Sequence, residues 1–308
     1  MDDKKKTSSV RNASDPNDPS VFGTRLLVDR DAVYNHNAWD NVEWDEEHEK
    51  YISEQLSKHL DSPMPPEEQE KINSYAAEHW NRFYERNENR FFKDRHWLRI
   101  EFPELFKIAE EEGPRVVLEV GCGAGNTLFP LLAECQKPDL FVHACDYSSV
   151  AVDVVKSHPE YDTRRSRAIV WDLTSTSLPE GVNPASIDVI VLIFVFSALR
   201  PEEWEQALIN LEKLLKPGGL ILFRDYGRHD LAQLRFKQGR MMQENFYVRG
   251  DGTRVYFFTP DEIQKLFSSR FTIEQNAVDR RLIVNRSRKL KMYRVWLQGK
   301  FKKPIHDS

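Results

Sequence analysis

The sequence is poor in cysteine and has no long apolar run and no clustered metal ligands. Its 308 residues include three cysteines, Cys122, Cys135 and Cys145, and no two of them form a C-x-x-C pair. This spacing argues against a disulfide framework or a zinc site, and we expect reduced thiols in the protein core. The histidines form no metal-binding motif, so no metal is expected. No apolar run is long enough to span a membrane, so no membrane contact is expected either.

The first 20 residues are charged and rich in serine, asparagine, aspartate and proline. Such a composition buries too little apolar surface to order a chain, so we expect a disordered tail over residues 1–20. The segment has neither the apolar core of a signal peptide nor the acid-free, arginine-rich character of a mitochondrial presequence. These features predict a cytoplasmic location, or one shared between nucleus and cytoplasm.

Charge is distributed unevenly along the chain. The formal net charge is −5, a sign that argues against nucleic-acid binding if the charge is spread uniformly. Acidic residues crowd positions 40–70, whereas the C-terminal stretch is basic. Its cations are Arg280, Arg281, Arg286, Arg288, Lys289, Lys291, Arg294, Lys300, Lys302 and Lys303. Cations also protect edge strands from pairing, but ten of them against Asp279 and Asp307 favour a phosphate-binding surface.

A glycine loop follows the apolar run Val116–Leu118. Gly121, Gly123 and Gly125 stand behind Glu119 in the pattern G-x-G-x-G. A dinucleotide site requires G-x-G-x-x-G, so the third glycine is misplaced for a pyrophosphate. The pattern resembles motif I of the class I S-adenosylmethionine-dependent methyltransferases. On its own it is equally typical of a tight turn between a strand and a helix.

Two later apolar runs also end in an acidic residue. Asp146 lies about 20 residues beyond the glycines, the distance at which such folds place the acceptor for ribose hydroxyls. Asp172 ends the next run, where a carboxylate can accept a hydrogen bond from the exocyclic amine of adenine while Leu173 packs on the adenine ring. Each aspartate alone is as well explained as a cap of the following turn. Three acidic strand ends in order favour a cofactor site.

The remaining pattern completes an α/β fold. The near-continuous apolar run Ile187–Phe194 predicts the central strand of a parallel sheet. We expect a doubly wound, mostly parallel, Rossmann-like sheet with an antiparallel edge strand, plus an N-terminal helical extension. The expected divisions are a tail over 1–20, an extension contributing to RNA and cofactor binding over 21–100, and a methyltransferase domain over 101–308. Further elements are expected as a helix over 201–215, a strand over 220–223, a helix near 260–268, a strand from Phe271 and another over 292–297.

Aromatic and basic residues alternate before the glycine loop. Trp80, Phe83 and Tyr84 share one helical face, and the stretch Arg90–Trp97 follows. This mixture suits base stacking and phosphate contact. An amphipathic helix that packs its aromatic stripe on the sheet explains the aromatics equally well. It explains Arg95 and His96 less well.

These residues resemble a known family, the enzymes that methylate N3 of cytidine 32 in the tRNA anticodon loop. The resemblance runs from Phe22 to the C-terminus. In detail, the sequence is most similar to the branch of the family that acts on threonine tRNA. The resemblance implies S-adenosylmethionine as cofactor and the tRNA anticodon stem-loop as partner, with an auxiliary synthetase or GTPase also to be considered. The stretches that carry it are Trp80–Tyr84, Phe91–Trp97, Phe223–Gly227, Glu244–Arg254, Asp279–Arg286 and Met292–Trp296.

The resemblance and the patterns together name candidate site residues. By the resemblance, the cofactor contacts are Trp80, Tyr84, Gly121, Asp146, Asp172, Leu173 and Ile193, and the glycine loop adds Gly123. The candidate RNA contacts are Arg25, Lys93, Arg95, His96, Arg280, Arg281, Arg286, Arg288, Lys289 and Arg294.

Cytosine N3 carries a lone pair and no proton at neutral pH, so methylation requires geometry rather than a general base. The product base is cationic, and a nearby carboxylate would stabilise the developing charge. Asp225, just past a predicted strand, is the catalytic candidate. It is equally well explained as a partner of Arg224 or as a cap of the following turn. Two other functions stay open: a small-molecule methyltransferase, and a catalytically silent cofactor-binding RNA adaptor.

Overall fold

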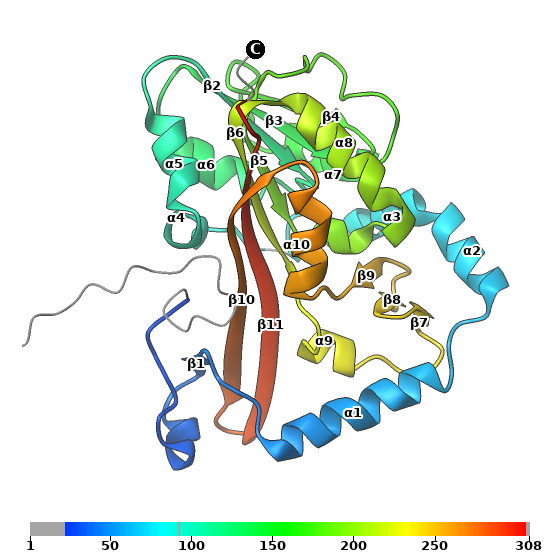
Figure 1. Ribbon diagram of the computed structural model, residues 1–308. Coiled ribbons are helices and arrows are strands. Elements are labelled where there is room, and N and C mark those ends of the chain that lie inside the picture. The colour runs from blue at the N-terminus through cyan, green and yellow to red at the C-terminus, as the bar shows by residue number, and fades with distance from the viewer. Residues whose placement is uncertain (1–21, 92, 306–308) are drawn as a thin grey trace, which may run out of the picture.

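The computed structural model describes residues 22–91 and 93–305 and contains one large mixed sheet (Figure 1). The strand order is β1-β10-β11-β6-β5-β2-β3-β4. The strands β2, β3, β4, β5 and β6 run parallel to one another. Their bounds are β2 Arg115–Val120, β3 Leu140–Asp146, β4 Ser166–Val170, β5 Ile187–Ile193 and β6 Leu215–Tyr226.

Helices cover both faces of this parallel part because its strands are apolar on both faces. In β2, Val117 packs in the cluster with α5, α6 and α7, whereas the next residue, Leu118, packs in the cluster with α8 and α10. β5 lies between β2 and β6, which confirms the predicted central strand. The covering helices are α4 Leu98–Glu101, α5 Pro103–Glu110, α6 Leu128–Glu134, α7 Ser149–Lys156, α8 Trp204–Leu214 and α10 Pro260–Ser268.

A long antiparallel hairpin closes the other side of the sheet. β10 (Thr272–Asn285) pairs with β11 (Leu290–Lys302), and β11 pairs antiparallel with β6. The hairpin extends well past the carboxyl end of β6 (Figure 1). The sequence missed the short strand β1 (Ala38–Asp40), which comes from the N-terminal extension and pairs antiparallel with β10. The extension therefore supplies the edge strand of the sheet.

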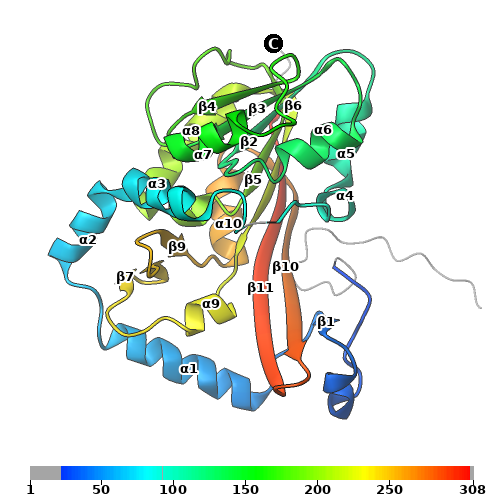
Figure 2. The ribbon, with the colours of Figure 1, turned by 180° about the vertical axis from the view of Figure 1, so that it is seen from behind.

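The helices of the extension are η1 (Arg30–Asn35), α1 (Glu46–Leu60), α2 (Pro66–Ser74) and α3 (Ala76–Asn87). They lie beside the hairpin (η1) and around an insert that follows β6 (α1, α2 and α3; Figure 2). The insert contains α9 (Leu231–Leu234) and a small antiparallel sheet of β7 (Met241–Gln243), β8 (Phe246–Val248) and β9 (Arg254–Tyr256). Figure 2 shows α1, α2 and α3 running around this small sheet.

Specific contacts join the extension to the insert. The backbone N–H of Met64 donates to the Met241 carbonyl over 2.8 Å, and the buried ring of His59 contacts the Tyr247 hydroxyl at 3.2 Å. Arg254 Nη1 donates to Asn73 Oδ1 over 2.9 Å. Two segments far apart in sequence thus form one wall beside the carboxyl ends of the parallel strands.

The fold class is confirmed, including the parallel sheet, the antiparallel strands and the N-terminal helices. The small sheet was not predicted, because its strands have only three residues each, too few to show alternation. The expected tail over residues 1–20 lies outside the described residues. The proposed boundary at residue 100 stays a prediction.

Candidate functional site

The glycine loop lies at the carboxyl end of β2, where ligands bind in open α/β sheets. Gly121 and Gly123 have φ values of 65° and 53°, which side chains other than glycine rarely adopt. A Cβ on Gly123 would lie 2.6 Å from the hydroxyl oxygen of Tyr84. Glycine is therefore required both by backbone conformation and by the close approach of α3.

Asp146 ends β3 directly beside this loop. Its Oδ2 accepts the N–H of Gly123 over 2.8 Å, and its Oδ1 accepts the N–H of Ser148 over 2.9 Å. Burial raises the pKa of Asp146 to about 6, while these backbone donors act in the opposite direction. Each oxygen has a further lone pair, so the carboxylate can still accept ribose hydroxyls.

Glu119, the first of the three acidic strand ends, lies behind the loop and has a different role from Asp146. Its side chain is buried, its Oε2 accepts the N–H of Leu128 over 3.1 Å, and its Oε1 lies 3.3 Å from Arg95 Nη1. The same Arg95 nitrogen donates to Thr127 Oγ1 over 2.9 Å. Burial raises the pKa of Glu119 to about 7. Arg95 thus holds the loop from behind, and its expected RNA contact stays a prediction.

The helix α3 brings two predicted cofactor residues to the loop. Tyr84 is buried, and the ring of Trp80 stacks against it with centroids 6.2 Å apart. The hydroxyl of Ser148, which caps α7, donates to Asn81 Oδ1 over 2.7 Å. This bond joins α3 to the turn after Asp146, and no sequence pattern predicts it.

The other predicted cofactor residues lie at neighbouring strand ends. Asp172 follows β4, and its Oδ1 accepts the N–H and the hydroxyl of Thr174 over 2.8 and 2.7 Å. Asp172 thus makes the turn contact that was the alternative explanation, through its Oδ1. Leu173 and Ile193 are buried, at 4% and 2% exposure. After Ile193, Phe194 adopts a φ of 60°, an uncommon conformation that the sequence did not predict.

Together these residues fit S-adenosylmethionine. The glycine loop gives a close backbone approach, Asp146 can accept ribose hydroxyls, and α3 adds aromatic surface. The fit rests on the space that a Cβ at Gly123 would fill and on the remaining acceptor capacity of Asp146. When bound, this cofactor supplies an electrophilic methyl group on a sulfonium.

Asp225 lies inside β6 rather than past its end, which corrects the expectation. It is fully buried; its Oδ2 accepts the N–H of Ser197 over 2.9 Å and its Oδ1 that of Tyr226 over 2.8 Å. Ser197 belongs to η2 (Phe196–Ala198), the turn after β5. Burial raises the pKa of Asp225 to about 6.

The suggested pair between Asp225 and Arg224 does not form. Successive residues of a strand point to opposite faces, so Arg224 points away from Asp225. Arg224 instead binds Asp279 and donates to Gln298 Oε1 over 2.7 Å. Its guanidinium lies 5.3 Å from the ring of Trp97 and 5.1 Å from that of Trp296.

The basic hairpin contains two kinds of cation. Several cations within the strands have acidic partners: Arg281 binds Asp279 and Glu101, each over 3.0 Å, and Arg294 binds Asp230 over 2.8 Å. Arg280 lies 5.6 Å from the ring of Trp44. These contacts compete with the RNA role expected of the strand cations.

The turn cations differ. Arg286, Arg288 and Lys289 are exposed between β10 and β11, as are Arg25, Lys93 and His96 elsewhere. His96 Nδ1 lies 4.0 Å from Glu134 Oε1. The turn cations and the glycine loop belong to the same edge of the sheet, because the hairpin extends past the carboxyl end of β6 (Figure 1).

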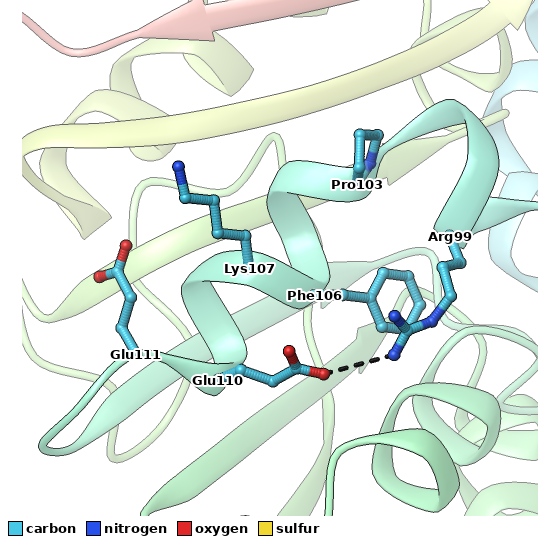
Figure 3. Close-up of a pocket in the computed structure, with 6 residues that line it drawn as sticks. All are labelled: Arg99, Pro103, Phe106, Lys107, Glu110 and Glu111. Atoms are coloured by element: carbon cyan, nitrogen blue, oxygen red, sulfur yellow. Dashed lines mark hydrogen bonds and ion pairs between the residues drawn. The ribbon is translucent and has the colours of Figure 1, made fainter.

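A surface hollow beside α5 is a different feature (Figure 3). It is lined by Arg99, Pro103, Phe106, Lys107, Glu110 and Glu111. Glu110 and Glu111 come just before β2 begins, so the hollow reaches the amino end of that strand, away from the glycine loop. Within residues 22–91 and 93–305, no group of three or more potential metal ligands occurs. No helix of that same part is long and apolar enough to cross a membrane.

The strand order, the glycine loop and the acidic strand ends define a class I S-adenosylmethionine-dependent methyltransferase. A family model described as a methyltransferase domain matches residues 118–221. The chain is also similar over most of its length to tRNA methyltransferases. It belongs to the family of tRNA N(3)-methylcytidine methyltransferases.

Three relatives place the chain in that family. The tRNA N(3)-methylcytidine methyltransferase trm140 of Schizosaccharomyces pombe is 51% identical, covering 98% of this chain and 97% of that protein. The tRNA N(3)-cytidine methyltransferase METTL2 of Danio rerio is 50% identical over 96% and 93% of the two chains. The tRNA(Thr) (cytosine(32)-N(3))-methyltransferase of Saccharomyces cerevisiae is 47% identical over 93% of this chain and 46% of that protein.

Solved structures agree on the fold alone. A methyltransferase of Anabaena variabilis aligns with a TM-score of 0.51 at 17% identity, covering 74% of this chain and 94% of that chain. The PH0226 protein of Pyrococcus horikoshii also aligns with a TM-score of 0.51 at 17% identity, covering 72% and 98%.

Proposed function

We propose that this enzyme methylates N3 of cytidine 32 in the anticodon loop of threonine tRNA. The observation that carries the proposal is the 47% identity to the Saccharomyces cerevisiae enzyme named for that nucleotide and that tRNA. The arrangement of the site supports it, because the cofactor residues and the exposed cations of the β10–β11 turn belong to one edge of the sheet. RNA bound along that edge would reach from the turn to the glycine loop.

We assign cofactor binding to the glycine loop, to Asp146 and to α3. Asp146 would accept ribose hydroxyls while its bonds to the loop amides fix its orientation. Trp80 and Tyr84 would close the site and exclude water, which favours methyl transfer over side reactions. Asp172 and Leu173 would contact the adenine, as the resemblance implies.

For the reaction itself, we propose an electrostatic role for Asp225. The N3 lone pair forms the bond to the methyl carbon, the electrons of the broken S–C bond stay on sulfur, and positive charge passes to the base. A buried carboxylate held by two backbone N–H groups does not reorganise as this charge develops, so its stabilisation is available at once. In the alternative, Asp225 only fixes η2 and Tyr226.

Because N3 lies on the Watson–Crick edge, the target must be unpaired and turned into the site, which a loop nucleotide allows at low cost.

We also propose that the protein acts in the cytoplasm, or in nucleus and cytoplasm. We further propose an aminoacyl-tRNA synthetase or a GTPase as an auxiliary protein partner. Affinity purification of the tagged full-length chain and its localisation by microscopy would test both points.

The decisive experiment is methyl transfer to threonine tRNA transcripts, followed by nucleoside analysis. We expect N3-methylcytidine with the natural loop and none when cytidine 32 is replaced by uridine. Purified Asp146→Ala protein is the matched enzyme control, and it should give little product at limiting cofactor. Tight RNA binding without methylation would favour the silent adaptor, whereas the absence of both would favour a small-molecule substrate.

A further inference from the structure

The insert carries an arginine that the cofactor site does not use. Arg249 lies in the turn between β8 and β9, and this turn is well fixed. The N–H of Arg249 donates to the Thr253 carbonyl over 2.8 Å, and the Thr253 hydroxyl donates to Asp251 Oδ1 over 2.7 Å. The position of Arg249 is therefore set by its own turn.

The guanidinium of Arg249 points to the carboxyl end of the parallel strands. It lies 5.5 Å from the ring centroid of Tyr226, the residue after Asp225. Tyr226 in turn contacts Phe194, which follows β5, with centroids 4.8 Å apart. Arg249 also acts electrostatically on Asp225, opposing the rise in its pKa. The half-buried cation is thus near the expected place of the target base.

Arg249 is half-buried, unlike the exposed Arg235 and Arg240 of the insert, and in the described part of the chain no carboxylate lies within 4 Å of it. Nearby arginines contact carboxylates within 4 Å, as Arg228 does with Glu262 at 3.0 Å and Arg254 with Glu203 at 3.9 Å. Within the part of the chain that the structure describes, no ion pair includes Arg249. Among the described residues, its side chain makes two long hydrogen bonds, of 3.4 Å to Thr253 Oγ1 and 3.3 Å to the Arg254 carbonyl.

An unneutralised guanidinium opposes a reaction that makes the base cationic. Like charges in a site of low dielectric raise each other's energy. An anion bound to Arg249 would remove this cost, and the nucleotide substrate itself carries one. Arginine binds phosphate oxygens well because its planar fork of N–H groups matches their geometry.

We propose that Arg249 binds the phosphodiester group of the target nucleotide and so holds that nucleotide against Tyr226 and Phe194. The inference rests on the proposed RNA substrate. It gives the insert a role in substrate positioning: the extension braces the insert, and the insert presents Arg249. The same oxyanion chemistry occurs in the carboxylate of the methyl donor, and the experiment separates the two sources.

The test combines an anticodon stem-loop with an Arg249→Ala variant. Binding is measured at several salt concentrations in the presence of S-adenosylhomocysteine, whose own affinity is measured by calorimetry. We expect RNA affinity to fall about 10-fold and the slope of log K against log salt to fall by about one contact, roughly 0.7 to 0.9. Cofactor-product affinity should stay unchanged. Arg164→Ala, at an exposed site before β4, is the charge-matched control.

A stem-loop with a neutral methylphosphonate at the target nucleotide sharpens the test and needs no variant. Wild-type protein should lose about 10-fold in affinity, whereas Arg249→Ala should lose little more, because both changes remove the same contact. Arg249→Lys should give an intermediate loss. Additive losses would overturn the inference, as would lower S-adenosylhomocysteine affinity with unchanged RNA affinity. Formation of N3-methylcytidine by wild type tests the proposed function separately.

Discussion

The two halves of the eight-stranded sheet use charge in opposite ways. In the parallel half, Asp146 and Asp225 are held by backbone N–H groups, which orient a carboxylate without cancelling its charge. In the hairpin half, Arg281 and Arg294 are held by carboxylates, which do cancel it. The exposed cations of this half, such as Arg286, lie at or near the turn between β10 and β11. Whether a charge serves a ligand therefore depends on what kind of group holds it.

The largest effect is expected for Asp146→Ala. It removes the acceptor proposed for the ribose hydroxyls and also the acceptor of the Gly123 N–H. We expect S-adenosylmethionine binding to weaken by about 2 to 4 kcal/mol, the range for losing charge-assisted hydrogen bonds. Calorimetry measures this directly. Near-native affinity would mean that the ribose does not bind at β3.

Asp225→Asn keeps the size of the side chain and removes its charge. We expect single-turnover methylation to fall by about 10 to 1000-fold, the scale of losing one electrostatic stabiliser. Affinities for tRNA and cofactor should stay close to wild type. Asp188→Asn is the control for removing a carboxylate charge from the same sheet: Asp188 also accepts a backbone N–H, from Val116 over 2.8 Å, but it binds Lys216 over 2.7 Å and lies at the amino end of β5. A loss in tRNA affinity instead would make Asp225 an organiser of the RNA surface.

Arg281→Ala tests the hairpin half of the comparison. Its partner Asp279 is fully buried, and losing one of its ion pairs should lower the free energy of unfolding by about 1 to 3 kcal/mol. Urea denaturation measures this loss. The affinity for tRNA should be retained, because the cation is already paired. A tRNA defect without a stability defect would show that RNA competes successfully for Arg281.

Replacing the three turn cations together should weaken tRNA binding without lowering stability. With Arg286, Arg288 and Lys289 changed to alanine, we expect about 10-fold weaker tRNA binding at physiological salt and a flatter salt dependence. Stability and cofactor affinity should not change, since the side chains are exposed. An alanine triple at Lys107, Lys156 and Arg164 provides the control. If the salt slope is unchanged, the cations protect the hairpin from pairing with other chains.

The smallest effect concerns pH. Burial raises the pKa values of Asp146 and Asp225 to about 6, and the proposed roles of both require the charged form. At pH 6 each carboxylate is about half charged, so single-turnover rates at limiting cofactor should be about 3-fold lower than at pH 7, and they should fall more steeply below pH 6 because both charges are lost. With Asp225→Asn and saturating cofactor, the profile should flatten. A wild-type rate that does not change between pH 7 and 5 would contradict both charge assignments.

Most of the candidate cofactor site could be predicted from the sequence because its signals are local. Each acidic residue ends an apolar run, and parallel strands bring their carboxyl ends to one edge whatever the packing details. Gly123, Asp146 and Asp172 could be placed on this basis. Trp80 and Tyr84 required the family resemblance, because nothing local indicates that α3 contacts the glycine loop.

The sequence by itself determined the parallel sheet, its order of strand ends and the basic character of the hairpin, because periodicity and spacing are properties of neighbouring residues. Only the tertiary structure decided which charges are available. Arg95 forms an ion pair with Glu119, and Arg224 forms one with Asp279. The partners are separated by 24 and 55 positions in the sequence. Arg249 has no carboxylate within 4 Å in the described part of the chain. The energy of a charge depends on its neighbours in space and on burial, and sequence spacing specifies neither.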